Sequence, residues 1–110
     1  MIVSDDTVSK ALAYLAEDPH PLALARYELT KCENHTKEIY SIGFLQSSGT
    51  SAAAREADAI SDGAYGDAKE MEAEAVKEME RHRARVKAAE MIIEVWRSEN
   101  ANARAAERVR

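Results

Sequence analysis

The sequence predicts an all-α protein: an elongated antiparallel helical hairpin with a long C-terminal helix and short flanking helices. Glycine and proline are sparse, at 4 and 2 of 110 residues, so few positions interrupt a helix. Apolar residues recur at alternating steps of three and four along two long stretches, which is the spacing of a coiled-coil seam. The chain holds one tryptophan and one phenylalanine among many alanines, and such small side chains favour helices that pack along their lengths.

The first helix is expected over residues 4–17. Ser4 or Asp5 can serve as its N-cap, and Asp6 places a negative charge near the positive end of the helix dipole. The following segment DPHP contains both prolines and ends the helix. The predicted apolar face consists of Val8, Ala11, Leu12 and Leu15.

A second helix over residues 21–48 and a short third helix over residues 51–61 follow. Pro21 suits the first turn of the second helix, because a backbone N–H would have no partner there. Thr50 or Ser51 can cap the short helix, and the sequence leaves open whether that helix packs on its own chain. The second helix carries a heptad-like stripe of Leu22, Ala25, Leu29, Cys32, Thr36, Ile39 and Gly43.

The last helix is expected over residues 67–108, starting at the capping-box-like segment DAKE. At 1.5 Å per residue it is roughly 60 Å long and the second helix roughly 40 Å, so the second helix cannot cover it fully. An apolar stripe left in water costs about 25 cal/mol per Å² that could be buried. We therefore expect Ile92, Ile93 and Trp96 to contact another chain. The seam of this helix runs through Ala75, Met79, His82, Val86, Ala89, Ile93, Trp96, Asn100 and Ala103.

This overhang predicts a homo-oligomer with coiled-coil-like packing. His82 and Asn100 interrupt the seam, and polar seam residues set register and oligomer number because they need a hydrogen-bond partner on the facing helix. Residues 1–110 as a whole are predicted to form a single helical domain. The candidate oligomer interface comprises Met79, His82, Val86, Ile93, Trp96 and Asn100.

No enzyme is expected, and no catalytic residue, cofactor or metal is assigned. The serines lack a nucleophile-elbow context, no glycine-rich loop follows a strand, and thin helical hairpins rarely form a concave pocket. Cys32 and His35 could supply two metal ligands, but His20 and His82 are not spaced to complete a zinc site. One cysteine, no signal peptide and no apolar run of roughly 20 residues predict a cytoplasmic protein with no membrane partner.

Charge is distributed unevenly along the chain. Residues 1–80 hold 7 Lys/Arg against 16 Asp/Glu, whereas residues 81–110 hold 8 against 4. The basic residues fall into a first cluster at residues 81–87 and a second at residues 97–110, and rows of arginine suit phosphate. In an oligomer the acidic block at residues 70–80 could instead pair with a neighbour's arginines. The candidate DNA-binding residues are Arg81, Arg83, Arg85, Lys87, Arg97, Arg104, Arg108 and Arg110.

The segments SSGTSAAAREADAISD and AAEMIIEVWRSENANARAAERVR resemble small phage-encoded proteins that accompany phage recombination, and in outline the UvsY-type recombination mediators. The likeness covers about residues 22–110. Such mediators form rings that bind single-stranded DNA and help load a RecA-like recombinase over single-strand-binding protein. The resemblance implies the same partners here, and the host cytoplasm as the location if a phage encodes the chain.

Two alternatives stay open at this point. Trp96 can pack in the oligomer seam or stack on a base, a contact worth about 1 to 3 kcal/mol. The protein can also be a non-enzymatic helical oligomer that acts through its acidic face, such as a phage scaffold, a regulator or an inhibitor of a host complex.

Overall fold

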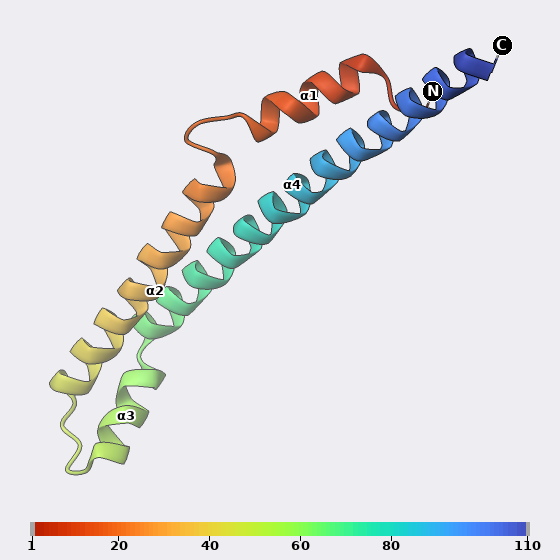
Figure 1. Cartoon of the computed structure of the whole chain (residues 1–110). Coiled ribbons are helices and arrows are strands. Elements are labelled where there is room, and N and C mark those ends of the chain that lie inside the picture. The colour runs from red at the N-terminus through yellow and green to blue at the C-terminus, as the bar shows by residue number, and fades with distance from the viewer. Residues whose placement is uncertain (1, 110) are drawn as a thin grey trace. The chain divides into compact units, whose positions relative to one another are not determined.

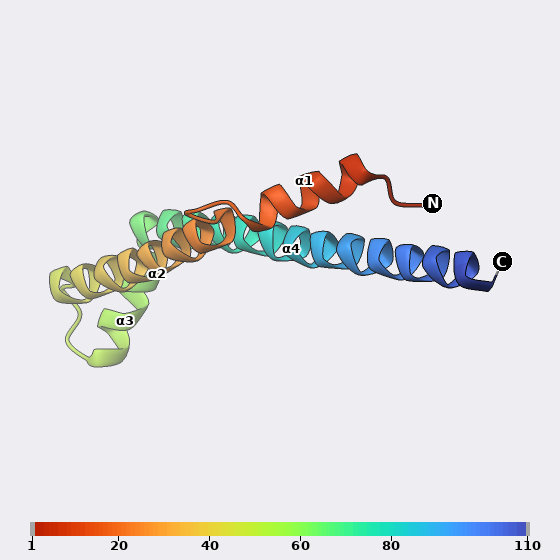
Figure 2. The ribbon, with the colours of Figure 1, turned by 45° about the horizontal axis from the view of Figure 1, so that its top comes forward.

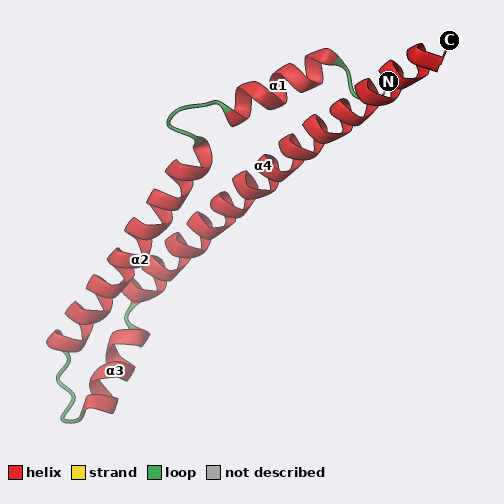
Figure 3. Cartoon of the chain, viewed as in Figure 1, coloured by secondary structure: helices red, strands yellow, loops and turns green. Residues whose placement is uncertain are grey.

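The computed structural model describes residues 2–109, which form four helices joined by short connections (Figures 1 and 3). No strand occurs among these residues, so the predicted all-α class is confirmed. None of the described helices is both long and apolar enough to cross a membrane. The helices are α1 (Asp5–Leu15), α2 (Pro21–Gln46), α3 (Ala52–Ser61) and α4 (Gly63–Val109).

The two short helices begin at serine caps that the sequence indicates. The Ser4 hydroxyl accepts a hydrogen bond from the Thr7 N–H at 3.1 Å, and the Ser51 hydroxyl accepts one from the Ala54 N–H at 3.1 Å. Each bond satisfies a backbone donor that a helix leaves unpaired at its start. α1 ends at Leu15, slightly before its predicted end, and the proline segment follows.

α4 begins at Gly63, ahead of its predicted start at Asp67. Gly63 and Gly66 lie ahead of that predicted start and inside the observed helix. In the structure the Asp62 carboxylate accepts a hydrogen bond from the Ala64 N–H at 3.1 Å and caps the helix there. A glycine costs only about 1 kcal/mol relative to alanine inside a helix, so a capped, packed helix tolerates both glycines.

The described chain divides into two compact units, and α4 contributes to both. Residues 23–80 form the hairpin unit, which contains most of α2, all of α3 and the first part of α4. Residues 2–22 and 81–109 form the basic unit, which contains α1 and the second part of α4.

Within the hairpin unit, α2 and the first part of α4 are antiparallel. Thr36 Oγ1 donates to Glu72 Oε2 at 2.9 Å, and one turn further along α2 the Tyr40 ring lies 6.2 Å from the Tyr65 ring. Residues later in α2 therefore contact residues earlier in α4. The predicted stripe of α2 faces inward in this unit: buried are Ala25, Cys32 and Thr36, and partly buried are Leu29, Ile39 and Gly43.

α3 packs on α2 through two very small residues. Ala59 is 0% exposed, and a Cβ placed on Gly43 would lie 3.1 Å from the Ala59 Cα. Arg55 extends the contact, because its guanidinium lies 5.9 Å from the centre of the Phe44 ring and its Nε donates to the Gly49 carbonyl at 3.1 Å. The short helix therefore packs on its own chain, which the sequence left open.

In the basic unit, α1 runs beside the second part of α4 in both views (Figures 1 and 2). Its core contains Ala11 and Tyr14 of α1 and Ala89 of α4. The sequence placed Leu12 on the apolar face, but Leu12 is half exposed and Tyr14 takes the buried position. Residues that pack around this core are Leu15, Val86, Ile92 and Ile93.

α1 therefore covers the stretch of α4 for which the sequence predicted a second chain. Ile92 and Ile93 pack against the α1 core, and Trp96 Nε1 donates to Asp5 Oδ1 at 3.2 Å. The sequence prediction compared the long helix with α2 alone and gave the apolar face of α1 no partner. Two apolar faces in one chain bury each other at no cost in association entropy, so α1 supplies part of the cover that the prediction assigned to another chain.

Candidate nucleic-acid interface

A buried tyrosine of α1 joins the two helices of the basic unit where the first basic cluster begins. Tyr14 Oη lies 3.0 Å from His82 Nδ1, and the Arg85 guanidinium lies 4.1 Å from the centre of the Tyr14 ring. The His20 ring packs against the same tyrosine, with ring centres 4.9 Å apart. His82 thus has a partner on a facing helix, as a polar seam residue requires, and that helix belongs to the same chain.

Sequence reasoning missed Tyr14, although a signal was present. Tyr14 follows Val8 and Ala11 at steps of three, and all three residues are buried. A tyrosine pairs a large apolar ring with a hydroxyl that needs a partner when buried. Its position on this row, together with the seam histidine on the long helix, could have indicated the α1–α4 contact.

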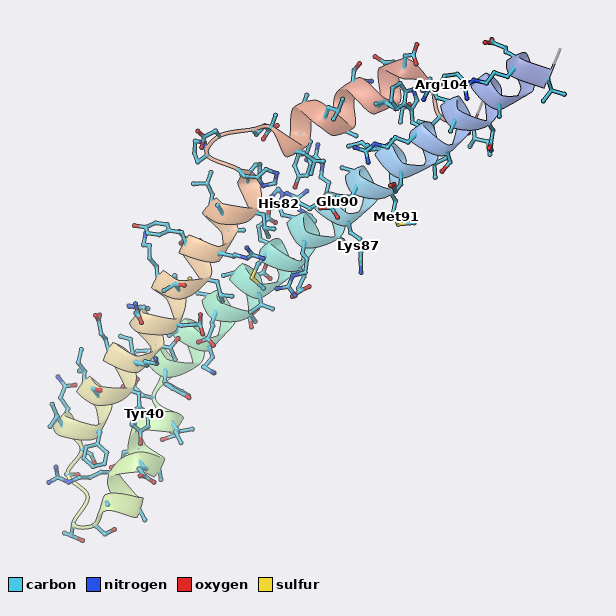
Figure 4. The ribbon with its side chains drawn as sticks, viewed as in Figure 1. Tyr40, His82, Lys87, Glu90, Met91 and Arg104 are labelled. Carbon is cyan, nitrogen blue, oxygen red and sulfur yellow. The ribbon has the colours of Figure 1, made fainter. Side chains whose placement is uncertain are left out.

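The first basic cluster is partly engaged in holding α1. Arg81 Nη2 lies 3.3 Å from His82 Nε2, and Arg85 stacks on Tyr14. A guanidinium over an aromatic ring contributes about 0.5 to 2 kcal/mol, depending on its desolvation. Lys87 projects from α4 away from α1 (Figure 4) and forms no ion pair within residues 2–109. All members of the cluster remain exposed, namely Arg81, Arg83, Arg85 and Lys87.

The second basic cluster is held by weaker contacts. Arg97 Nη1 lies 3.7 Å from Glu94 Oε1, and both side chains are about two-thirds exposed, so this ion pair stabilises little. Arg104 Nε donates to the Asn100 carbonyl at 3.4 Å, a long hydrogen bond. Arg108 lies in the last turn, where a positive charge is favoured by the helix dipole.

The last turns of α4 extend beyond the part that α1 covers. Residues 101–109 are exposed on every face of the helix. Arg104 and Arg108 lie in this segment, and neither forms an ion pair with another described residue. Arg110, which the sequence also assigned to DNA binding, lies outside the described residues. This segment therefore presents two exposed guanidiniums that form no ion pair with other described residues, with Glu107 as the one carboxylate side chain among residues 101–109.

The residues predicted to form the oligomer interface are all at least partly buried in their own chain. Trp96 donates its indole N–H to Asp5 of α1, so its ring belongs to the α1 contact. Next to it, the Glu99 carboxylate accepts a hydrogen bond from the Ile2 N–H at 2.8 Å. The structure places these interface candidates as follows: His82 is buried, and Met79, Val86, Ile93, Trp96 and Asn100 are partly buried.

The two units differ in charge. Residues 23–80 hold 6 Lys/Arg against 12 Asp/Glu, which gives −6, whereas the remaining residues hold 9 against 8, which gives +1. In the hairpin unit, an open groove of about 380 Å³ is lined by four glutamates around the buried Cys32: Glu28, Glu70, Glu74 and Glu78. The same acidic side holds the pKa of Lys77 above its ordinary value, chiefly through a hydrogen bond from Lys77 to Glu74. The hairpin unit thus has an acidic face of its own.

No protein family model, no curated protein and no solved structure matches this chain. The resemblance to UvsY-type mediators accordingly rests on the sequence segments quoted above.

Proposed function

We propose that this chain binds single-stranded DNA through the basic second half of α4 and assists a RecA-like recombinase or an annealing protein. The observation that carries the proposal is the exposed end of α4, where Arg104 and Arg108 have no carboxylate partner among the described residues. Arg97 lies seven residues before Arg104 on the same helical face, and its pairing with Glu94 is weak. The phosphates of a DNA backbone supply negative charges that can pair with this row of arginines.

The proposed contact is with the backbone and not with base edges. The described residues form helices and connections only, and none of these helices belongs to a helix-turn-helix or lies beside an aromatic-rich sheet. Arginines on one exposed helix face can follow a row of phosphates but read little sequence. Binding is therefore expected to be nonspecific, as suits a protein that coats or loads single strands.

A homo-oligomer is part of the proposal, together with a RecA-like recombinase and single-strand-binding protein as partners. In an oligomer, one basic unit bound to a DNA strand holds the basic units of the other subunits close to neighbouring phosphates. This raises their effective concentration at those phosphates, so several weak contacts give a higher overall affinity. Because α1 already packs on part of the seam that the sequence assigned to this purpose, we propose a different surface of α4 for the oligomer.

The alternative function is an interaction protein that acts through the hairpin unit. The groove lined by Glu28, Glu70, Glu74 and Glu78 supports it, because a concave acidic surface suits a basic protein partner. Such a protein would be a scaffold, a regulator or an inhibitor. This alternative function would depend on the acidic groove and not on the end of α4. Substitutions in one surface or the other therefore distinguish the two functions.

Arg104→Ala/Arg108→Ala should weaken binding to single-stranded DNA alike for oligo-dT and a mixed sequence. Each lost phosphate contact removes part of the released-counterion free energy, so the salt dependence should also become shallower, by about 0.7 in logarithmic slope per contact. Fluorescence anisotropy with labelled oligonucleotides measures both quantities. Neither residue contacts α1, so circular dichroism of the variant should match that of the wild type.

Arg26→Ala/Lys31→Ala is the matched control, since it removes two exposed positive charges from the hairpin unit. It should leave DNA affinity within about twofold, because these residues lie outside the basic unit. Equal losses in the two double variants would show that net charge matters and the end of α4 does not. Unchanged affinity of Arg104→Ala/Arg108→Ala would reject the proposed interface.

A further inference from the structure

The second part of α4 carries another stripe, on the side opposite to its seam. Members of this outer stripe lie two residues beyond seam residues, which is about 200° around the helix axis. Every member is exposed, and Met91 is 63% exposed. Figure 4 shows Met91 projecting from α4 on the side away from α1. At alternating steps of four and three, the outer stripe contains Ala84, Ala88, Met91, Val95, Ser98, Asn102, Ala105 and Val109, and none of these carries a charge.

The same helical positions are charged in the first part of α4. Stepping back from Ala84 with the same spacing meets only charged residues, namely Arg81, Lys77, Glu74, Glu70 and Asp67. A helix face that remains in water ordinarily carries charged and polar residues, as this first part does. The change from charged to uncharged at Ala84 leaves a face of about 39 Å without the charged side chains that an ordinary water-facing helix side carries.

We propose that the part of the outer stripe from Ala84 to Val95 pairs with the same part of a second copy of this chain, and that the two helices run antiparallel. Its alanines allow two helix backbones to approach closely, and Met91 and Val95 supply larger apolar contacts. The basic unit has room for such a contact, because two paired helices leave their outer sides uncovered. None of its described side chains larger than alanine is fully buried.

The charges beside the outer stripe determine the direction of the pair. Lys87 and Glu94 lie seven residues apart on the flank away from α1, and an antiparallel pair brings Lys87 of each copy near Glu94 of the other. A parallel pair would instead bring Glu94 near Glu99 of the second copy, which is a repulsion. The other flank is already engaged with α1 through Arg85 and Glu99.

This dimer is independent of DNA binding, and its test is distinct from the test of the proposed function. Wild-type protein should sediment at twice the chain mass of 12.2 kDa at concentrations of tens of micromolar. Met91→Lys should raise the dimer dissociation constant at least tenfold, since two charges would enter one apolar contact by symmetry. Sedimentation velocity over a concentration series measures this constant.

Met71→Lys is the matched control, because Met71 lies on the same helix and is 53% exposed but lies off the outer stripe. It should change the dissociation constant less than threefold, and circular dichroism should show the helix content of the wild type for both variants. A wild-type protein that stays monomeric up to about 200 μM, or equal effects of the two variants, would overturn the proposal. DNA binding by a monomeric wild type would reject the dimer and the oligomer of the proposed function, and would leave DNA binding by the end of α4 standing.

A charge exchange tests the direction. Lys87→Glu should weaken the dimer about fivefold at low salt, because it places two like charges together at both symmetry-related contacts. Lys87→Glu/Glu94→Lys restores unlike pairs in an antiparallel dimer and should recover most of that loss. A double variant as weak as Lys87→Glu alone would contradict the antiparallel arrangement.

Discussion

Replacing Tyr14 with alanine is expected to destabilise the contact between α1 and α4 by about 3–5 kcal/mol, the range for removing a large buried ring. Tyr14 is buried in the core of the basic unit, where it contacts His82, Arg85 and His20. The substitution removes the ring from beneath the guanidinium and leaves the imidazole of His82 without its partner on α1. No other single side chain of α1 forms as many of the described contacts.

The only tryptophan of the chain reports this change locally. Trp96 donates its indole N–H to Asp5, so urea unfolding followed by tryptophan fluorescence reads the docking of α1 on α4. Tyr14→Phe should cost only about 1 kcal/mol, because it keeps the ring and loses a hydrogen bond. Tyr27→Ala is the control, since Tyr27 is 64% exposed, and it should stay within about 0.5 kcal/mol. A Tyr14→Ala variant that unfolds at the same urea concentration as the wild type would contradict the α1–α4 contact.

Gly43→Leu is expected to have the next largest effect, on the contact between α2 and α3. Even the first carbon of a side chain at this position would lie 3.1 Å from the Ala59 Cα, and Ala59 is completely buried. The obstacle is backbone, which cannot rotate away, so α3 must move off α2. Overpacking of this kind costs about 1–3 kcal/mol or more. Hydrogen exchange should become faster over residues 52–61, and the melting temperature should fall.

Gly66→Leu is the matched control for this substitution. Gly66 lies inside α4 with open space where its Cβ would be, so leucine there gains helix propensity without a clash. The expected result is a stabilisation of about 0.5–1 kcal/mol, opposite in sign to Gly43→Leu. A destabilisation of similar size in both variants would show that the close approach of α2 and α3 is not the cause.

The sequence predicted those parts of the fold that depend on local periodicity. The spacing predicted the seam of the long helix up to Asn100, where Ala75, His82 and Ala89 are buried and the other members partly buried, whereas Ala103, its last predicted member, is exposed. The caps were predicted as Ser4 or Asp5 and as Thr50 or Ser51, because a cap needs only a suitable side chain just before a helix, and Ser4 and Ser51 are the caps in the structure. Local chemistry determines both features, so a single sequence contains them.

The partner of each helix could not be predicted in the same way. A seam shows that a face is covered, but Val86 and Ile93 have the same spacing whether α1, α2 or another chain covers them. The correct partner, Tyr14, lies 68 residues from His82 along the chain. Similarly, the predicted start at Asp67 left out Gly63 and Gly66, whereas the Asp62 side chain caps α4 so that the helix begins at Gly63.

The sequence predicted which basic residues form the candidate site. It did not predict which of them pack on α1 and which extend beyond it. Arg85 is spaced like the other arginines, yet it stacks on Tyr14, whereas Arg104 and Arg108 extend beyond α1. This division depends on where α1 ends over α4, which is a tertiary property. The outer stripe, in contrast, was readable from the sequence, and only its exposure needed the structure.

The most direct test of DNA binding by the basic half of α4 is the salt dependence of wild-type affinity for single-stranded oligo-dT. Phosphate contacts by three or four side chains predict that the logarithm of affinity falls with the logarithm of salt at a slope of roughly −2 to −3, at about −0.7 per contact. Fluorescence anisotropy between about 50 and 300 mM salt gives this slope. No binding at about 50 mM salt, or an affinity that does not change with salt, would contradict the account.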